Sequence, residues 1–286
     1  MQQNEKNKVE GSTLYLVGTP IGNLADMTER AKKVLAEVDF IAAEDTRNSM
    51  KLLSLFGIHA ELVSYYEHNK RESGERIIAR LLGGESCALI TDAGMPAISD
   101  PGEDLVRLCA ESGVTVRVVP GPSACVSALA LSGLPTARFT FEGFLPAQKG
   151  ERKKRLEALA KEERTMIFYE APHKLRATLD DMLEIFGKER KISLCRELTK
   201  LNEETERTTL ENAVAGYKAK EPRGEYVLVI EGGVGGADSS DNPLLSLSPE
   251  EHVAHYEKQG MKRMDAIKAA AKDRGMSKSD LYKELI

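Results

Sequence analysis

The chain has 286 residues, enough for two domains and a small appendage. Its 41% hydrophobic and 30% charged residues are typical of an ordinary soluble protein. A net charge of −5 argues against a simple polybasic nucleic-acid binder but allows a local basic patch. The four cysteines, Cys87, Cys109, Cys125 and Cys195, contain no Cys-x-x-Cys pair, so we expect buried thiols in a reducing cytoplasm rather than disulfides or metal ligands.

The first half of the chain alternates short aliphatic runs with amphipathic stretches, which is the pattern of parallel βαβ units. Residues 1–12 are polar and are expected to be disordered, with no apolar secretion signal. Strands are then expected at 13–17, 40–43, 87–90 and 115–119, and helices at 27–37, 49–56, 73–82 and 103–112. The uncharged stretch 118–137 is interrupted by Pro and Gly, so it predicts a buried helix at 123–131 and no membrane span.

A second α/β set and a helical tail follow. Strands are expected at 139–144, 166–169, 192–195 and 226–231, with helices at 150–161, 174–186 and 209–219 and a polar edge segment at 203–208. Residues 232–242 are rich in Gly, Ser and Asp, which favours a flexible linker. In the tail we expect two or three helices, with Gly275 ending one and Ser277 or Ser279 capping another. The predicted fold is therefore α/β, divided into domains at 13–122 and 123–232, a linker at 233–247 and a small helical domain at 248–286.

Four loops of unusual composition follow strands of the first set. One such loop is equally well a plain turn, but the carboxyl ends of parallel strands meet at a ligand-binding crevice, where small residues let ligand and backbone approach closely. The loops read Gly-Thr-Pro-Ile-Gly-Asn at 18–23, Glu-Asp-Thr-Arg at 44–47, Thr-Asp-Ala-Gly-Met-Pro-Ala-Ile-Ser-Asp-Pro-Gly at 91–102 and Pro-Gly-Pro-Ser-Ala at 120–124. Four of them at one edge of a sheet indicate a ligand site.

Together with Tyr-Glu-Ala-Pro-His at 169–173 and Cys-Arg-Glu-Leu-Thr-Lys at 195–200, these loops resemble one known family. The chain is similar, over 14–231 and again over 265–286, to the bacterial 16S ribosomal RNA (cytidine-2′-O)-methyltransferases of the tetrapyrrole methylase superfamily. The resemblance implies two α/β domains with S-adenosylmethionine in the cleft between them, and a homodimer. It also implies methyl transfer to the ribose 2′-hydroxyl of a decoding-centre cytidine.

The chain departs from its relatives at two points. Met95 stands where the family usually carries Thr, which places a local hydrogen bond in question. Asp92 is followed by Ala-Gly-Met-Pro, whereas tetrapyrrole-modifying members carry Gly-Asp-Pro and a downstream Tyr-Gly. This difference weakens the hypothesis that the substrate is a porphyrin. The alternatives are a methyltransferase acting on a small tetrapyrrole and a non-catalytic RNA-binding factor on the same scaffold. The linker and the helical tail favour an RNA enzyme, and the intact loops speak against a non-catalytic factor.

A nucleoside-containing cofactor needs apolar walls and backbone polar groups. The resemblance implies cofactor contacts at Pro20, Thr91, Asp92, Ala93, Gly94, Met95, Ser123, Ala124, Tyr169, Glu170 and Leu198. Ser123 could instead cap the following helix and Tyr169 could be a core aromatic, whereas Asp92 would be costly to bury without a partner. A sulfonium donor is already activated, so no metal is expected. The five histidines show no ligand pattern, although His252 and His255 lie three apart on a helix that we expect to be exposed.

An RNA substrate, whether 16S rRNA or the assembled small subunit, requires cations for its phosphates. The sequence offers these candidates: Arg47, Lys149, Arg152, Lys153, Lys154, Arg155, His173, Lys174 and Arg196. The run 149–155 is equally typical of a solvated helix face. Residues 251–286 hold eight Lys or Arg against six Asp or Glu, which suggests either an RNA-docking module or a packing element.

The group that removes the hydroxyl proton is not singled out by the sequence. Asp45, Asp100, Glu197 and Lys200 are the catalytic candidates, and Glu44 also lies on a cleft loop. Asp45 could instead pair with Arg47, Asp100 could cap the helix that follows it, and loss of the proton to water would also suffice.

Overall fold

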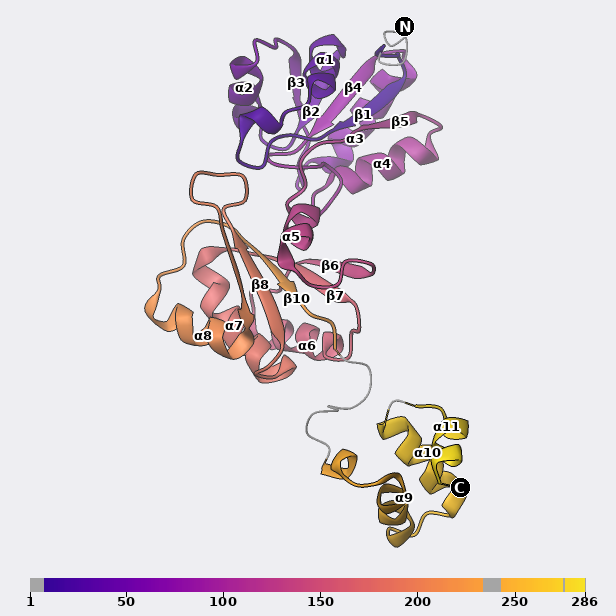
Figure 1. The fold of residues 1–286 in the computed structure, drawn as a ribbon. Coiled ribbons are helices and arrows are strands. Elements are labelled where there is room, and N and C mark those ends of the chain that lie inside the picture. The colour runs from indigo at the N-terminus through magenta and orange to yellow at the C-terminus, as the bar shows by residue number, and fades with distance from the viewer. Residues whose placement is uncertain (1–7, 234–242, 275, 286) are drawn as a thin grey trace, which may run out of the picture. The chain divides into compact units, whose positions relative to one another are not determined.

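The computed structural model describes residues 8–233, 243–274 and 276–285, which form two compact units (Figure 1). The first unit spans Met1–Glu157 and Thr165–Glu231, and the second spans Ala158–Arg164 and Gly232–Ile286. Most of the expected N-terminal disorder, residues 234–242 of the expected linker, and Gly275 lie outside the described residues. The domain boundaries given above therefore stay a prediction.

The first sheet is entirely parallel, with strand order β3-β2-β4-β1-β5. Its strands are β1 (Thr13–Val17), β2 (Phe40–Ala43), β3 (Glu61–Ser64), β4 (Ser86–Ile90) and β5 (Thr115–Val119). The four strands expected from the sequence are confirmed. The prediction missed β3, because an edge strand whose apolar residues are Leu62 and Val63 alone carries too little periodicity to be recognised.

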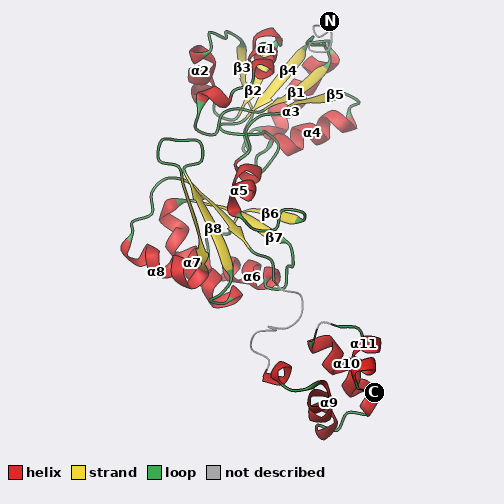
Figure 2. Ribbon diagram, viewed as in Figure 1, coloured by secondary structure: helices red, strands yellow, loops and turns green. Residues whose placement is uncertain are grey.

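Helices cover both faces of this sheet, giving three layers (Figure 2). They are α1 (Glu29–Glu37), α2 (Thr46–Leu55), α3 (Lys70–Leu82) and α4 (Gly102–Glu111). Helix α1 begins where Thr28 accepts a hydrogen bond from the Ala31 amide, and it buries Ala31, Val34 and Leu35 at helical spacing. Alternate residues of β1 enter opposite cores, since Tyr15 packs with α1 and Leu14 packs on the side of α3 and α4.

The second sheet is mixed, with strand order β6-β7-β10-β8-β9 and one parallel pair, β6 with β7. Its strands are β6 (Phe139–Phe144), β7 (Thr165–Glu170), β8 (Lys191–Arg196), β9 (Glu204–Thr209) and β10 (Tyr226–Ile230). The helices of this region are α5 (Ala124–Ser132), α6 (Lys149–Leu159), α7 (Pro172–Phe186) and α8 (Leu210–Ala219). The polar segment β9 lies at the sheet edge, as expected, and the predicted α/β class is confirmed.

Helix α5 is the buried helix expected within the long uncharged stretch. Cys125, Ala128 and Leu129 pack against strands β7, β8 and β10, while Val126 faces solvent. No helix among the described residues is long and apolar enough to cross a membrane.

Among the described residues of the second unit, three α-helices pack around a core of their own. They are α9 (Pro249–Lys258), α10 (Arg263–Asp273) and α11 (Lys278–Glu284). Ser248 and Glu251 form a capping box at the start of α9, and Ser277 caps α11 as predicted. The core residues Val253, Ile267 and Leu281 come one from each helix, so the packing of the tail is internal.

The expectation that the histidine pair lies on an exposed helix is wrong for His252, whose side chain is fully buried. Its Nδ1 accepts a hydrogen bond from Arg274 Nε at 3.1 Å, so the proton lies on Nε2, which faces Asp273 Oδ2 at 3.1 Å. Tyr256 donates to the same carboxylate, and Arg274 also donates to the Leu247 carbonyl. This network joins α9 to α10 in the role of a buried structural histidine.

The four cysteine thiols are free and buried, as expected. Burial raises the pKa of Cys109 and of Cys125 to about 11, and it also raises the pKa of Cys87 and Cys195. Because the thiolate is the nucleophile, native protein near pH 8 should alkylate with iodoacetamide at least about tenfold more slowly than unfolded protein. Mass spectrometry of a time course measures this, and any thiol that reacts at the unfolded rate would contradict its burial.

Candidate active site

The four loops of the first sheet converge at the carboxyl ends of its strands. Thr19 and Gly94 exchange two backbone hydrogen bonds, at 2.9 and 3.1 Å, which ties the first loop to the third. The first loop also meets the fourth, because a Cβ built on Gly18 would lie 2.7 Å from the Gly121 Cα. Gly94 has a φ of 86°, a left-handed conformation that favours glycine. Glycine is therefore needed at Gly18 and Gly121, where the backbones of two loops meet, and is favoured at Gly94 by its left-handed conformation.

A cavity of about 600 Å³ opens beside these loops and is shared by both sheets of the first unit. The first sheet contributes residues of all four loops: Ile21, Glu44, Thr91, Asp92, Ala93, Gly94, Met95, Ile98, Ser99, Asp100, Ser123 and Ala124. The second sheet contributes the ends of β6, β7 and β8 and the start of β10: Phe144, Tyr169, Glu170, Ala171, Pro172, His173, Cys195, Leu198, Lys200, Glu225, Tyr226 and Val227. All eleven predicted cofactor residues except Pro20 line this cavity.

Pro20 lies instead in a neighbouring hollow of about 200 Å³, which it shares with Gly22 and Asn48. Thr91 and Asp92 line both spaces and form the wall between them. Asp92 is exposed to solvent and accepts a hydrogen bond from the Asn48 amide at 3.4 Å, so its carboxylate carries no burial penalty.

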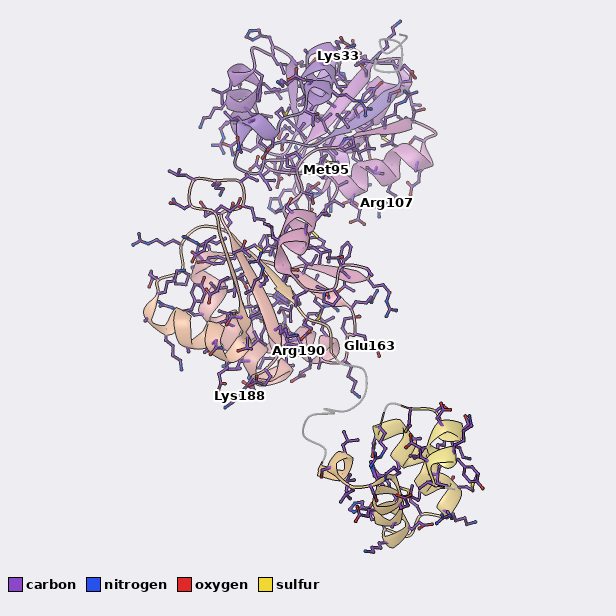
Figure 3. All side chains as sticks on the ribbon, viewed as in Figure 1. Lys33, Met95, Arg107, Glu163, Lys188 and Arg190 are labelled. Atoms are coloured by element: carbon purple, nitrogen blue, oxygen red, sulfur yellow. The ribbon has the colours of Figure 1, made fainter. Side chains whose placement is uncertain are left out.

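The cavity is lined by apolar and by polar or charged residues in about equal number. Tyr169 is half-buried between Phe141 and Phe144 at ring-centroid distances of 5.0 and 5.5 Å, and burial raises its pKa to about 12, so its hydroxyl stays protonated. Met95 lies on the loop after β4 (Figure 3), and its sulfur would be 2.8 Å from a Cβ on Gly18. Met95 thus packs between two loops, a role that needs no hydroxyl.

Two polar groups in the wall are placed to meet a ligand. Glu170 is 5% exposed; it accepts hydrogen bonds from Thr178 Oγ1 at 2.6 Å and from the Ala171 amide at 2.9 Å. Ser123 occupies the N-cap position of α5, but its side chain makes no capping hydrogen bond. Ser123 therefore occupies the cap position with its backbone, but its hydroxyl does not cap the helix.

Two of the four catalytic candidates are engaged in holding their own loops. Asp45 caps α2 and pairs with Arg47 at 2.8 Å, and this hydrogen bonding with the Arg47 side chain and amide lowers the pKa of Asp45 to about 2. Asp100 accepts hydrogen bonds from three backbone amides, those of Ala97, Ile98 and Gly102, at 2.7 to 3.3 Å. Asp100 lines the cavity, but its carboxylate is engaged in these hydrogen bonds, which stabilise the loop before α4.

The other two candidates form an ion pair with each other. Glu197 accepts from Lys200 Nζ at 2.8 Å, and this hydrogen bond, with one from the Glu225 amide, lowers the pKa of Glu197. Burial acts to lower the pKa of Lys200, yet hydrogen bonds with Glu197 and Glu225 raise it overall, so Lys200 stays charged. Glu44 is different, because it lines the cavity, accepts one hydrogen bond from Thr91 Oγ1 at 2.9 Å, and has no ion pair among the described residues.

One predicted RNA-binding cation needs correction. Arg152 is 6% exposed, and its guanidinium pairs with the buried Asp181 of α7 at 2.7 Å. It joins two helices, and a charge paired at this depth is not available to phosphates. The sequence could not reveal this, because nothing in the run 149–155 distinguishes the residue facing α7.

The remaining basic candidates divide between the cavity and the surface. His173 lines the cavity with Lys174 next to it in α7, whereas Lys149 and Lys154 are exposed on α6. Lys153, Arg155, Arg47 and Arg196 are paired with Glu184, Glu142, Asp45 and Glu204 respectively.

The family model for tetrapyrrole (corrin/porphyrin) methylases matches residues 13–214, which include both sheets except β10. The chain belongs to this family. The membership in the tetrapyrrole methylase superfamily inferred from six short motifs is thereby confirmed.

Curated proteins from several bacteria resemble the chain over nearly its whole length. A protein of Halalkalibacterium halodurans is 50% identical over 98% of this chain and 97% of its own length. One from Bacillus subtilis is 46% identical over 98% and 96%, and one from Escherichia coli O157:H7 is 42% identical over 99% and 98%. All three are named ribosomal RNA small subunit methyltransferase I.

Solved structures of tetrapyrrole methylases share the fold. A cobalt precorrin-4 methyltransferase superposes with a TM-score of 0.56 at 18% identity, covering 77% of this chain and 95% of its own. The uroporphyrin-III C-methyltransferase of Thermus thermophilus, complexed with S-adenosylhomocysteine, gives 0.53 at 22% identity, covering 76% and 96%.

Several cavity residues of this methylase were missed by the sequence reasoning. Phe144, Ile98 and Ser99 line the space, as do Glu225 and its neighbours at the start of β10. Residues 98 and 99 lie inside a recognised loop and could have been included. Phe144 could not, because its orientation depends on a β-bulge that the sequence pattern does not reveal.

Proposed function

We propose that this protein is an S-adenosylmethionine-dependent methyltransferase that methylates the ribose 2′-hydroxyl of a cytidine in 16S rRNA of the small ribosomal subunit. The observation that carries the proposal is the near full-length identity, 42% to 50%, with relatives named small-subunit rRNA methyltransferases. This similarity continues past residue 214, where the family model ends, through the helical tail.

The cavity supports S-adenosylmethionine as cofactor by its size and chemistry. A space of about 600 Å³ lined by both apolar and polar residues suits a nucleoside joined to an amino acid. The Glu170 carboxylate and the uncapped Ser123 hydroxyl are placed to receive polar groups, and the tight loop contacts at Gly18 and Gly94 shape the remaining wall. When bound, the cofactor supplies a methyl group already activated by a sulfonium.

The protein must then align the hydroxyl, exclude water and accept a proton. We assign proton acceptance to Glu44, because the other carboxylates considered are ion-paired or engaged by several backbone amides. The Thr91 hydroxyl orients Glu44 at the carboxyl end of β2. The Asp45–Arg47 pair fixes the start of α2 immediately after it.

Methylation of a small tetrapyrrole is the competing function, and it has the support of the fold shared with porphyrin and corrin enzymes. That similarity stands at 22% identity or less and concerns the scaffold. We propose ribosomal RNA because the end of α9 and the turn to α10 expose Lys258 and Lys262, and Arg263, which pairs with Glu257, is exposed beside them; such cations suit an anionic macromolecule. We further propose a cytoplasmic homodimer.

Removal of Pro249–Ile286 tests the tail. Since the core of α9–α11 is made of its own residues, the first unit should keep its circular dichroism spectrum and its affinity for S-adenosylmethionine. Its kcat/KM on small-subunit particles should fall about tenfold or more, because several phosphate contacts would be lost. Full activity in the folded truncation would exclude a docking role, and loss of the dimer would assign the tail to assembly.

The proposed function itself is tested by cofactor calorimetry followed by transfer of a tritiated methyl group. Small-subunit particles from cells lacking this enzyme should be labelled, and a porphyrinogen offered in parallel should not. Labelling of the porphyrinogen alone would establish the competing function, and cofactor binding without transfer to either would indicate a different substrate.

A further inference from the structure

Phe144 is an exposed aromatic residue at the mouth of the cavity. Its side chain is 61% accessible and lines the space, although no cofactor or catalytic role was assigned to it above. The rings of Phe144 and Tyr169 make a T-shaped contact, with their centroids 5.5 Å apart. This contact holds one side of the Phe144 ring and leaves its other side free. An aromatic ring with one free face at the mouth of a cavity can offer that face to a bound ligand.

A β-bulge turns Phe144 toward the cavity. The pairing of β6 with β7 runs from Phe141 opposite Ile167 to Gly143 opposite Phe168 and Phe144 opposite Tyr169, so one extra residue is inserted. Simple alternation would place residues 141 and 144 on opposite faces, but with the bulge both lie on the face of Tyr169. Gly143 accommodates the bulge with a φ of 63°.

A second wall from the first sheet approaches this position. Ile98 is 53% exposed and lines the cavity on the loop before α4. Its neighbours Ala97 and Ser99 have φ angles of 66° and 64°, a strained backbone held by the three hydrogen bonds to Asp100. A Cβ built on Gly143 would lie 3.1 Å from Ser99 Oγ, so the two walls nearly touch next to Phe144 and Ile98.

We propose that Phe144 is the stacking platform for the target nucleobase, with Ile98 as the apolar residue of the facing wall. The inference rests on the proposed function, since an RNA base must leave its stack before its ribose can enter an enclosed site. A base that leaves its stack loses contacts with its neighbouring bases. The flat apolar surface at the mouth of the cavity provides contacts that replace them. Phe144 thereby fixes the position of the ribose relative to Glu44.

The protein contains no tryptophan, so Phe144→Trp introduces a single fluorescent reporter at the platform. Stacking of a base should quench this reporter when small-subunit particles are added in the presence of S-adenosylhomocysteine. Phe139→Trp is the matched control, because Phe139 is 40% exposed on the same strand and does not line the cavity. The control fluorescence should not change.

Kinetics give the second readout. Phe144→Ala should lower kcat/KM on small-subunit particles on the order of ten- to a hundredfold, which corresponds to the loss of one base stack. Phe144→Trp should keep most of the activity, Phe139→Ala should match wild type, and cofactor affinity should be unchanged throughout.

Three outcomes would overturn the proposal: full activity in Phe144→Ala, equal loss in the alanine and tryptophan variants, or loss of cofactor affinity, which would place Phe144 in the cofactor site. Failure of the wild-type protein to methylate any RNA would instead remove the proposed function on which the inference rests.

Discussion

Gly18→Ala should weaken S-adenosylmethionine binding by about ten- to a hundredfold and destabilise the first unit by roughly 1–3 kcal/mol. The added methyl would lie 2.7 Å from the Gly121 Cα and 2.8 Å from the Met95 sulfur. Because the Gly121 neighbour is backbone, no side-chain rotation can relieve the contact. The first and fourth loops would have to separate, and the cavity would lose its shape. Calorimetric titration of the cofactor and thermal unfolding measure the two effects.

Gly150→Ala is the matched control for this substitution. Gly150 lies in α6, where a Cβ would meet no atom within 4 Å and the backbone is not left-handed. Alanine there should be neutral or slightly stabilising through helix propensity. Equal behaviour of Gly18→Ala and Gly150→Ala would show that the loops do not meet as described.

Asp92→Ala should lower kcat/KM by about a hundredfold, chiefly through weaker cofactor binding. Asp92 follows β4 at the carboxyl edge of the sheet and forms part of the wall between the two cavities. Its carboxylate is exposed and accepts one hydrogen bond, from Asn48, so it can accept further hydrogen bonds from a ligand. Calorimetry and methyl-transfer kinetics measure both quantities. A variant that binds and turns over normally would place the site elsewhere.

Two further variants separate binding from chemistry. Glu44→Gln should keep cofactor affinity and lose turnover, because the amide cannot accept the hydroxyl proton. Asp180→Ala removes an exposed carboxylate from α7, outside the cavity lining, and should leave both quantities unchanged. If Glu44→Gln retained kcat, proton acceptance by Glu44 would be disproved.

The sequence was sufficient where a feature depends on local pattern. Strands β1, β2, β5 and β6 begin and end at the residues expected, because each is an apolar or β-branched run bounded by turn residues. The grouping of the four loops also followed from local pattern, since parallel strands place their carboxyl ends at one edge.

It was insufficient where a role depends on a partner distant in the chain. In the sequence Arg152 is one cation among several, and only the structure shows that it pairs with Asp181 of α7. The sequence likewise suggests an exposed His252, and only the structure shows that α10 covers it. The same applies to Phe144, whose face is set by a register shift against β7. Asp45 and Glu197 could be nominated as bases from the sequence, but only their ion pairs with Arg47 and Lys200 show them to be engaged.

The most direct test of the proposed function is nucleoside mass spectrometry of the RNA product. Small-subunit particles from cells lacking this enzyme would be incubated with the protein and isotopically labelled S-adenosylmethionine, and the 16S rRNA would then be digested to nucleosides. The proposal predicts the label in 2′-O-methylcytidine, at about one residue per 16S rRNA, with the initial rate of labelling lowered about a hundredfold in Asp92→Ala. Label on a nucleobase, label on another nucleoside, or no label in RNA from an enzyme that binds the cofactor would contradict it.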